Sequence, residues 1–232
     1  MEESNPKKLL INSLVTKAAV KQKVYDNTLG VLSQTKSILT ETQKEINAKL
    51  KSIDKRILIE YKDRGKFEAE LKVGGDILIF SMHTNTFDFD HSHKVHQLSY
   101  VRKDHLNSFC GIIHIYNFLS DSFKYNRTED LGYLIARLFI NRENHFFLEG
   151  KRQLGYLYND FTNRVIDKAI LRQIIYSVIL YALDFDLFVP PYDAVSILSV
   201  EQMIQKFQNP KFITGKRMGF HFNYEDVKDN EP

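Results

Sequence analysis

Phe67-Glu-Ala-Glu-Leu-Lys-Val73-Gly-Gly-Asp76-Ile-Leu-Ile-Phe-Ser-Met82 is the stretch that decides the fold of this chain. Apolar and charged residues alternate up to Val73, which is the period of a strand with one buried face. The Gly-Gly pair predicts a tight turn into a second strand that begins at Ile77 and is apolar on both faces. The stretch therefore predicts an antiparallel hairpin with a buried second strand.

Three later stretches extend this sheet. We expect strands at residues 109–118, 145–149 and 218–224, since each combines aromatic or β-branched residues over a short length. In the last of them Phe220 and Phe222 face one way and His221 faces the other. Together with the hairpin, these strands predict a mostly antiparallel sheet.

About three helices are expected to pack on the sheet. The first covers residues 128–139, with Thr128 as its N-cap and an apolar face at helical spacing. The second covers residues 166–183 and is apolar around most of its circumference. The third begins at the capping box Ser199-Val-Glu-Gln202. The fold class predicted for this part of the chain is α+β.

A long helix is expected before the sheet. Residues 9–57 contain no proline, and Leu32, Leu39, Ile46 and Ile53 recur every seven residues. The second seam position of each repeat is occupied by Leu29, Lys36, Gln43, Leu50 and Ile57. The centre of this seam is polar, so it is typical of an imperfect coiled coil. We expect the helix to pair with a second copy; folding back onto its own domain is the alternative.

These elements predict three parts: a basic helical stalk at residues 1–57, an α+β domain at 58–224 and an acidic, disordered tail at 225–232. The stalk holds eleven Lys or Arg against six Asp or Glu. Nucleic acid is a weaker alternative partner for it, because its lysines are spread around the helix and acids interrupt them.

The sequence also indicates in which compartment the protein resides and whether it crosses a membrane. The single cysteine, Cys110, excludes an internal disulfide, lies in an apolar run, and is expected to be a buried structural thiol. The N-terminus lacks the apolar core of a signal peptide. The apolar stretch at 174–183 is too short to cross a bilayer. We therefore expect a cytoplasmic protein with no membrane partner.

The densest chemistry is His83-Thr-Asn-Thr-Phe-Asp88-Phe-Asp90-His91-Ser-His93-Lys-Val-His96, which places four of the eight histidines beside two carboxylates. In an extended chain Asp88 and Asp90 share one face. Histidines 83, 91 and 93 with these carboxylates suit a divalent metal such as zinc, manganese or iron. The spacing matches no defined metal motif, so a solvated strand end and turn is the favoured interpretation and a metal or substrate site is the alternative.

Two further groups are candidate sites. Glu149 and Lys151 form a Glu-x-Lys on an expected strand, which resembles the strand element of restriction-endonuclease-like nucleases. That resemblance implies magnesium at the acid and requires an upstream acid, for which Asp121 and Asp130 are the nearest candidates. A salt-bridging role is the alternative for this pair. The pairs Lys151-Arg152 and Lys216-Arg217 are candidates for an anion-binding patch.

No nucleophile motif or phosphate loop is present in the sequence. The favoured hypothesis is therefore a cytoplasmic binding or adaptor module displayed on a helical dimerisation stalk, with an unknown protein partner. The alternative is a metal-dependent hydrolase or nuclease that uses the His/Asp cluster or the Glu-x-Lys strand.

Overall fold

The computed structural model describes residues 5–151, 154–185, 189, 191–201 and 203. It begins with a continuous helical run of 45 residues. This run consists of α1 (Pro6–Ser13), the π-helical turn η1 (Leu14–Ala18) and α2 (Ala19–Leu50). A short 3-10 turn, η2 (Lys55–Ile57), leads from the helix into the sheet. The predicted long N-terminal helix is confirmed.

Six antiparallel strands follow, and each pairs with the next along the chain. They are β1 (Glu60–Asp63), β2 (Glu68–Val73), β3 (Asp76–Met82), β4 (Cys110–Leu119), β5 (Tyr133–Asn141) and β6 (Phe146–Gly150). The predicted hairpin is β2 and β3, with Val73 paired to Asp76 across its turn. The α+β class with a mostly antiparallel sheet is therefore confirmed.

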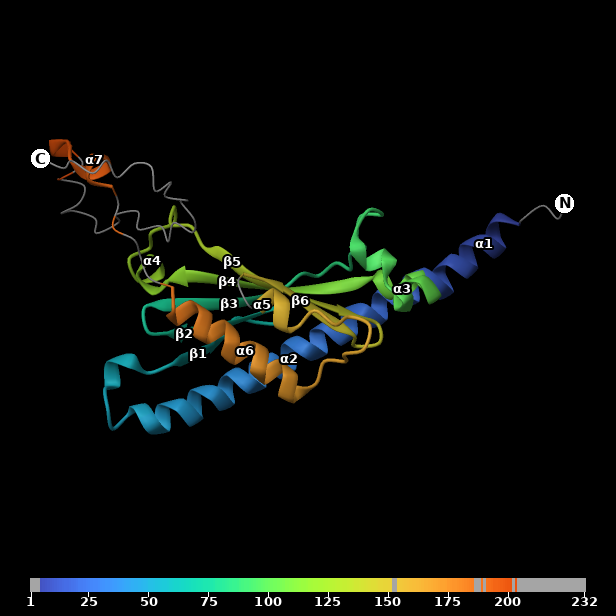
Figure 1. Cartoon of the computed structure of the whole chain (residues 1–232), viewed down its shortest axis with the longest axis horizontal. Helices are drawn as coiled ribbons and strands as arrows, with labels where there is room; N and C mark the ends of the chain where they lie inside the picture. Colours follow the sequence, from blue (N-terminus) through green and yellow to red (C-terminus); the bar gives the residue numbers. More distant parts are fainter. Residues whose placement is uncertain (1–4, 152–153, 186–188, 190, 202, 204–232) are drawn as a thin grey trace, which may run out of the picture.

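Helices α2 and α6 (Lys168–Leu183) cover the same face of the sheet (Figure 1). The second expected helix is thus found at its predicted place, with Asp167 as its N-cap. Short helices complete the described chain: α4 (Ser120–Lys124), α5 (Leu154–Leu157) and α7 (Tyr192–Val195). The main core lies between the sheet and the two long helices.

The central heptad residues of α2 are buried in this core, whereas Ile53 and Ile57, which follow the helix, are 74% and 43% exposed. Leu32 and Leu39 are both fully buried, and Val31 and Ile38 lie beside them on the same face. Three threonines spaced by seven residues widen the buried stripe. These are Thr28, Thr35 and Thr42. A stripe of this width fits a globular core, whereas a coiled-coil seam is narrower.

The structure therefore matches the alternative given for this helix, which is that it folds back onto its own domain. The sheet and α6 of the same chain cover Leu32 and Leu39. Residues of α2 and residues of the sheet share one hydrophobic core, so this part of segment 1–57 packs on segment 58–224. Self-association itself is a separate question, which stays a prediction.

Among the described residues, the second face of the sheet is covered at one end. The connection from β3 to β4 contains η3 (Lys94–Gln97), α3 (Ser99–Lys103) and η4 (His105–Ser108). It packs over Phe139 and Phe147 in a second apolar cluster. Farther along this face, the rings of His114, Tyr116 and Phe118 are half-buried and form a row along β4.

The predicted helix at residues 128–139 is wrong. Most of this stretch is β5, paired with β4 on one side and β6 on the other. A bulge places Ile135 as an extra residue between Leu134 and Ala136, which breaks the period of two. Both faces of the strand are covered, so its apolar residues imitate a helical pattern. Leu134 is only half-buried and lies outside the main core cluster.

The remaining expected elements fall partly or wholly outside the described residues. The helix expected from Ser199 is described only at its start, and the strand at 218–224 and the tail at 225–232 are not described. Among the described helices, none is both long and apolar enough to cross a bilayer.

A close approach fixes α2 against the middle of the sheet. A methyl group on Gly111 of β4 would lie 2.1 Å from the Thr28 hydroxyl oxygen, which is far inside van der Waals contact. The Thr28 hydroxyl is itself buried and donates to the Val24 carbonyl at 2.7 Å. Glycine is therefore needed on the strand where the helix crosses it.

A charged clamp joins the two helices at their exposed edge. Lys168 Nζ lies 2.8 Å from Glu41 Oε1, and the guanidinium of Arg172 pairs with the other carboxylate oxygen. Lys168 first, and then Arg172, lower the pKa of Glu41 to about 2. The clamp orients α6 along α2.

Leu39→Ala should destabilise the whole domain by about 2 to 5 kcal/mol, because it leaves a cavity in the main core. Leu9→Ala is the control, since Leu9 is 53% exposed and should change stability by less than about 0.5 kcal/mol. Urea unfolding followed by circular dichroism measures both. An unchanged midpoint for Leu39→Ala would contradict the placement of α2.

Gly111→Ala should destabilise the fold by about 1 to 3 kcal/mol, because the new methyl group collides with Thr28. The loss should be smaller in a Thr28→Ala background, which removes the closest atoms. A double-mutant cycle from urea unfolding gives this coupling. Strictly additive effects would mean that the helix does not cross the strand at this point.

Candidate functional site

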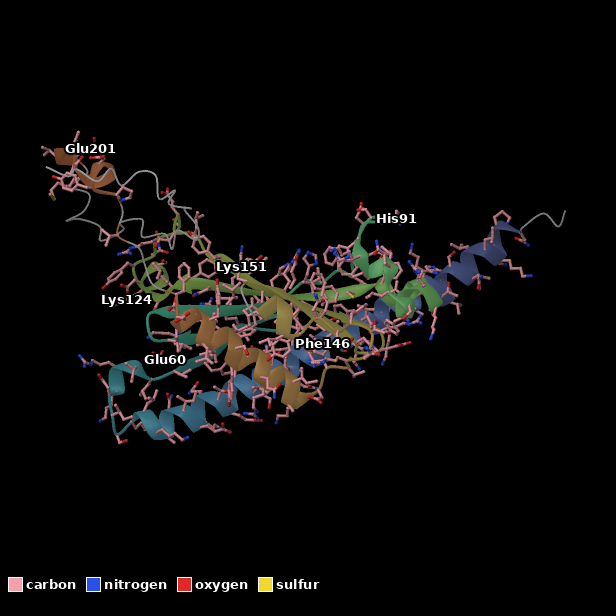
Figure 2. The ribbon with its side chains drawn as sticks, viewed as in Figure 1. Glu60, His91, Lys124, Phe146, Lys151 and Glu201 are labelled. Carbon is pink, nitrogen blue, oxygen red and sulfur yellow. The ribbon has the colours of Figure 1, made fainter. Side chains whose placement is uncertain are left out.

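The predicted His/Asp cluster lies in the connection from β3 to β4, and His91 stands near its tip (Figure 2). His83 is anchored to the sheet, because its backbone N–H donates to the Ile112 carbonyl at 2.9 Å. Its Nδ1 accepts from the Asn85 N–H at 3.0 Å, and its ring packs edge-on against Phe87. His83 therefore begins a turn.

The two carboxylates of the cluster also stabilise local structure. Phe87 and Phe89 point into the second apolar cluster, while Asp88 and Asp90 are exposed. Asp88 accepts from the buried Ser108 hydroxyl at 2.6 Å. Asp90 accepts from the hydroxyl and the N–H of Ser92, and these bonds lower the pKa of its carboxyl group.

The two remaining histidines of the metal hypothesis have different surroundings. His93 caps η3 by accepting from the Val95 N–H at 3.2 Å, and its ring stacks on Phe89. His91 is exposed, with its ring centroid 6.0 Å from that of His96. In the described part of the chain, no three His, Cys, Asp or Glu residues are placed to share a metal ion. The metal hypothesis gains no support from this geometry.

Glu149 of β6 forms a cross-strand ion pair. Arg137 of β5 is its register partner, and Arg137 Nε donates to Glu149 Oε2 at 2.6 Å. His114 is the next residue in this row across the sheet. Burial, and then the positive charge of Arg137, lower the pKa of His114. This pair matches the salt-bridging alternative for the Glu-x-Lys motif.

Lys151 follows β6 directly. It is exposed and lines a hollow with Leu154, Leu180 and Asp184 at the end of α6. Of the upstream acids proposed for a nuclease, Asp130 accepts from Ser122 at 2.6 Å. The other members of the anion-binding patch, Arg152, Lys216 and Arg217, lie outside the described residues.

Cys110 is fully buried at the start of β4. Burial raises the pKa of its thiol well above the usual range. A reactive thiol needs access to solvent and a lowered pKa. The expected structural role of Cys110 is therefore confirmed.

A different group of residues forms the best candidate site. A shallow groove of about 560 Å³ lies between the start of α2 and the residues that follow β3. Its lining residues are Lys21, Gln22, Tyr25, Thr84, Asn85, Thr86 and Phe87. The Thr86 hydroxyl donates to the Lys21 carbonyl at 3.2 Å, which ties the two walls together.

The charge around this groove has one sign. Lys21 is the charged residue of the lining, and its Nζ lies 5.5 Å from the centroid of the Phe109 ring. Lys66 lies beside the groove, with its Nζ 5.7 Å from the Tyr25 ring. No carboxylate, histidine or thiol is among the lining residues. The lining combines one ammonium group, two rings and several hydrogen-bond donors, with the ammonium group of Lys66 near the Tyr25 ring.

Sequence reasoning found one wall of this groove and missed the other. The stretch after His83 was singled out for its histidines and acids, but its Thr-Asn-Thr run lines the groove. The stalk prediction places Lys21, Gln22 and Tyr25 on a basic oligomerisation helix, so it does not predict this wall. The sequence feature that could have indicated this wall is the absence of acidic residues between Asn5 and Tyr25.

Comparison with family models, curated proteins and solved structures finds no match for this chain. Its function is therefore argued from its own residues.

Asp88→Ala should destabilise the fold by about 0.5 to 1.5 kcal/mol through the lost bond from Ser108. Zinc should shift the melting temperature of this variant and of the wild type equally, because the carboxylate acts structurally. Thermal unfolding with and without zinc measures both effects, and Asp26→Ala is the control. Zinc stabilisation that disappears with Asp88 would instead restore the metal hypothesis.

Proposed function

We propose that this protein is a binding module and that the groove beside α2 is its ligand site. The observation that carries the proposal is the composition of the lining: one lysine, two rings and the polar side chains of Thr84, Asn85 and Thr86, with no acid among them. Such a lining attracts an anion and offers it charge-assisted hydrogen bonds.

The expected ligand is a small anion that carries a planar group. Lys21 and Lys66 supply the positive charge, and Tyr25 and Phe87 supply rings on which a planar group can stack. A binding role is favoured over hydrolysis because the lining has neither a carboxylate nor a histidine to move a proton.

The wider role proposed is that of a cytoplasmic adaptor. The single, buried cysteine fits a reducing compartment. Pairing of two copies remains part of this proposal, although the central heptad residues Leu32 and Leu39 are buried in the core of the same chain.

Titration with phenyl phosphate and with inorganic phosphate tests the groove. Amide chemical shifts should change at residues 21–25 and 84–87, and phenyl phosphate should bind more tightly because it also stacks. Lys21→Gln should weaken binding about tenfold, which corresponds to one charge-assisted bond of about 1.4 kcal/mol.

Lys44→Gln is the matched control, because Lys44 is an exposed lysine of the same helix away from the groove. It should bind both anions as the wild type does. Equal losses in the two variants, or shifts spread over all surface lysines, would show nonspecific attraction and overturn the proposed site.

A further inference from the structure

Residues 6–18, which we name the projecting segment, extend beyond the sheet at the N-terminal end of the molecule (Figure 1). None of its residues is buried. It nevertheless carries five large apolar side chains that are 51% to 68% exposed. These are Leu9, Leu10, Ile11, Leu14 and Val15. The cluster is too concentrated for an ordinary solvated helix end.

The projecting segment is amphipathic. Leu10 and Leu14 lie four residues apart, as do Ile11 and Val15, so each pair shares a side of the helix. Asn12 and Thr16 follow a different side and are joined by a hydrogen bond of 2.7 Å. The apolar side lies outside both hydrophobic clusters of the domain, and Val15 lines a hollow together with Leu106.

Its charge indicates the kind of partner. Lys7, Lys8 and Lys17 lie in the segment, Lys21 and Lys23 follow it, and no acid occurs between Asn5 and Tyr25. A second copy would bring lysines against lysines in either a parallel or an antiparallel pair, with no acid in the segment to compensate. An anionic surface fits better, because each lysine contributes about 1 kcal/mol near anionic lipids.

We propose that the projecting segment adsorbs to an anionic lipid surface and lies in its interfacial plane. Apolar side chains enter the headgroup region while lysines contact lipid phosphates and carboxylates. The segment is too short to span a bilayer, since 13 residues of helix extend only about 20 Å.

This proposal revises the expectation of no membrane partner. That expectation rests on the apolar stretch at 174–183, which is too short to cross a bilayer. Adsorption to a lipid surface needs no spanning helix, and it concerns a different part of the chain.

Sedimentation with lipid vesicles tests the proposal on the full chain. Vesicles with about 30% phosphatidylserine in phosphatidylcholine should pellet the protein, whereas pure phosphatidylcholine should not. Raising the salt concentration should weaken binding, because it screens the lysines. The double variant Leu10→Ser/Leu14→Ser, and separately Lys7→Gln/Lys8→Gln, should each lose at least about tenfold in affinity, equivalent to about 1.4 kcal/mol.

Leu157→Ser is the control, because Leu157 is 51% exposed elsewhere on the surface; it should bind vesicles as the wild type does. Circular dichroism melting shows whether each variant stays folded, and the exposed positions predict that they do. Equal binding to neutral vesicles, or unchanged binding of Leu10→Ser/Leu14→Ser, would overturn the proposal. The proposal would also fail if the protein did not bind vesicles but formed a concentration-dependent dimer that these substitutions abolish. A second copy would then cover the projecting segment.

Discussion

The close crossing of α2 over the sheet is the constraint on which the rest of this structure depends. At this crossing the Thr28 side chain occupies the space that a side chain on Gly111 would need. Thr28 and Thr35 can be buried because each hydroxyl donates to the carbonyl four residues earlier in the helix. Polar residues at heptad spacing thus widen an apolar stripe, and the sheet covers a helix that would otherwise require another chain.

The position of α2 also produces both surfaces for which we propose a role. The start of α2 is held beside the residues after β3, so Lys21 and Tyr25 form one wall of the groove. The helical run is longer than the sheet that supports it, and its first residues therefore remain uncovered (Figure 1). A ligand site and an exposed apolar segment follow from one packing arrangement.

The His/Asp segment shows that residues able to bind a metal ion can instead stabilise local structure. Histidine and aspartate side chains accept hydrogen bonds from nearby backbone N–H groups, which is what a turn and a 3-10 helix start require. His83, Asp90 and His93 all accept such bonds. The alternating Phe87 and Phe89 anchor the segment on the sheet. These histidines and aspartates are close together in the sequence, but the fold does not bring their side chains together around one point.

The sequence by itself determined the hairpin, the strand at β4, the apolar helix α6 and the long N-terminal helix, because each has a local period or turn that few other structures satisfy. Tertiary structure alone decided that residues 133–141 form a strand, since coverage on both faces and a bulge at Ile135 remove the period that marks one. It also decided which stripe of α2 is buried, since the sheet removes water from Thr28 and Thr35, whose hydroxyl groups bond within the helix. The groove was likewise outside the reach of sequence patterns, because its two walls are about sixty residues apart and meet only through packing.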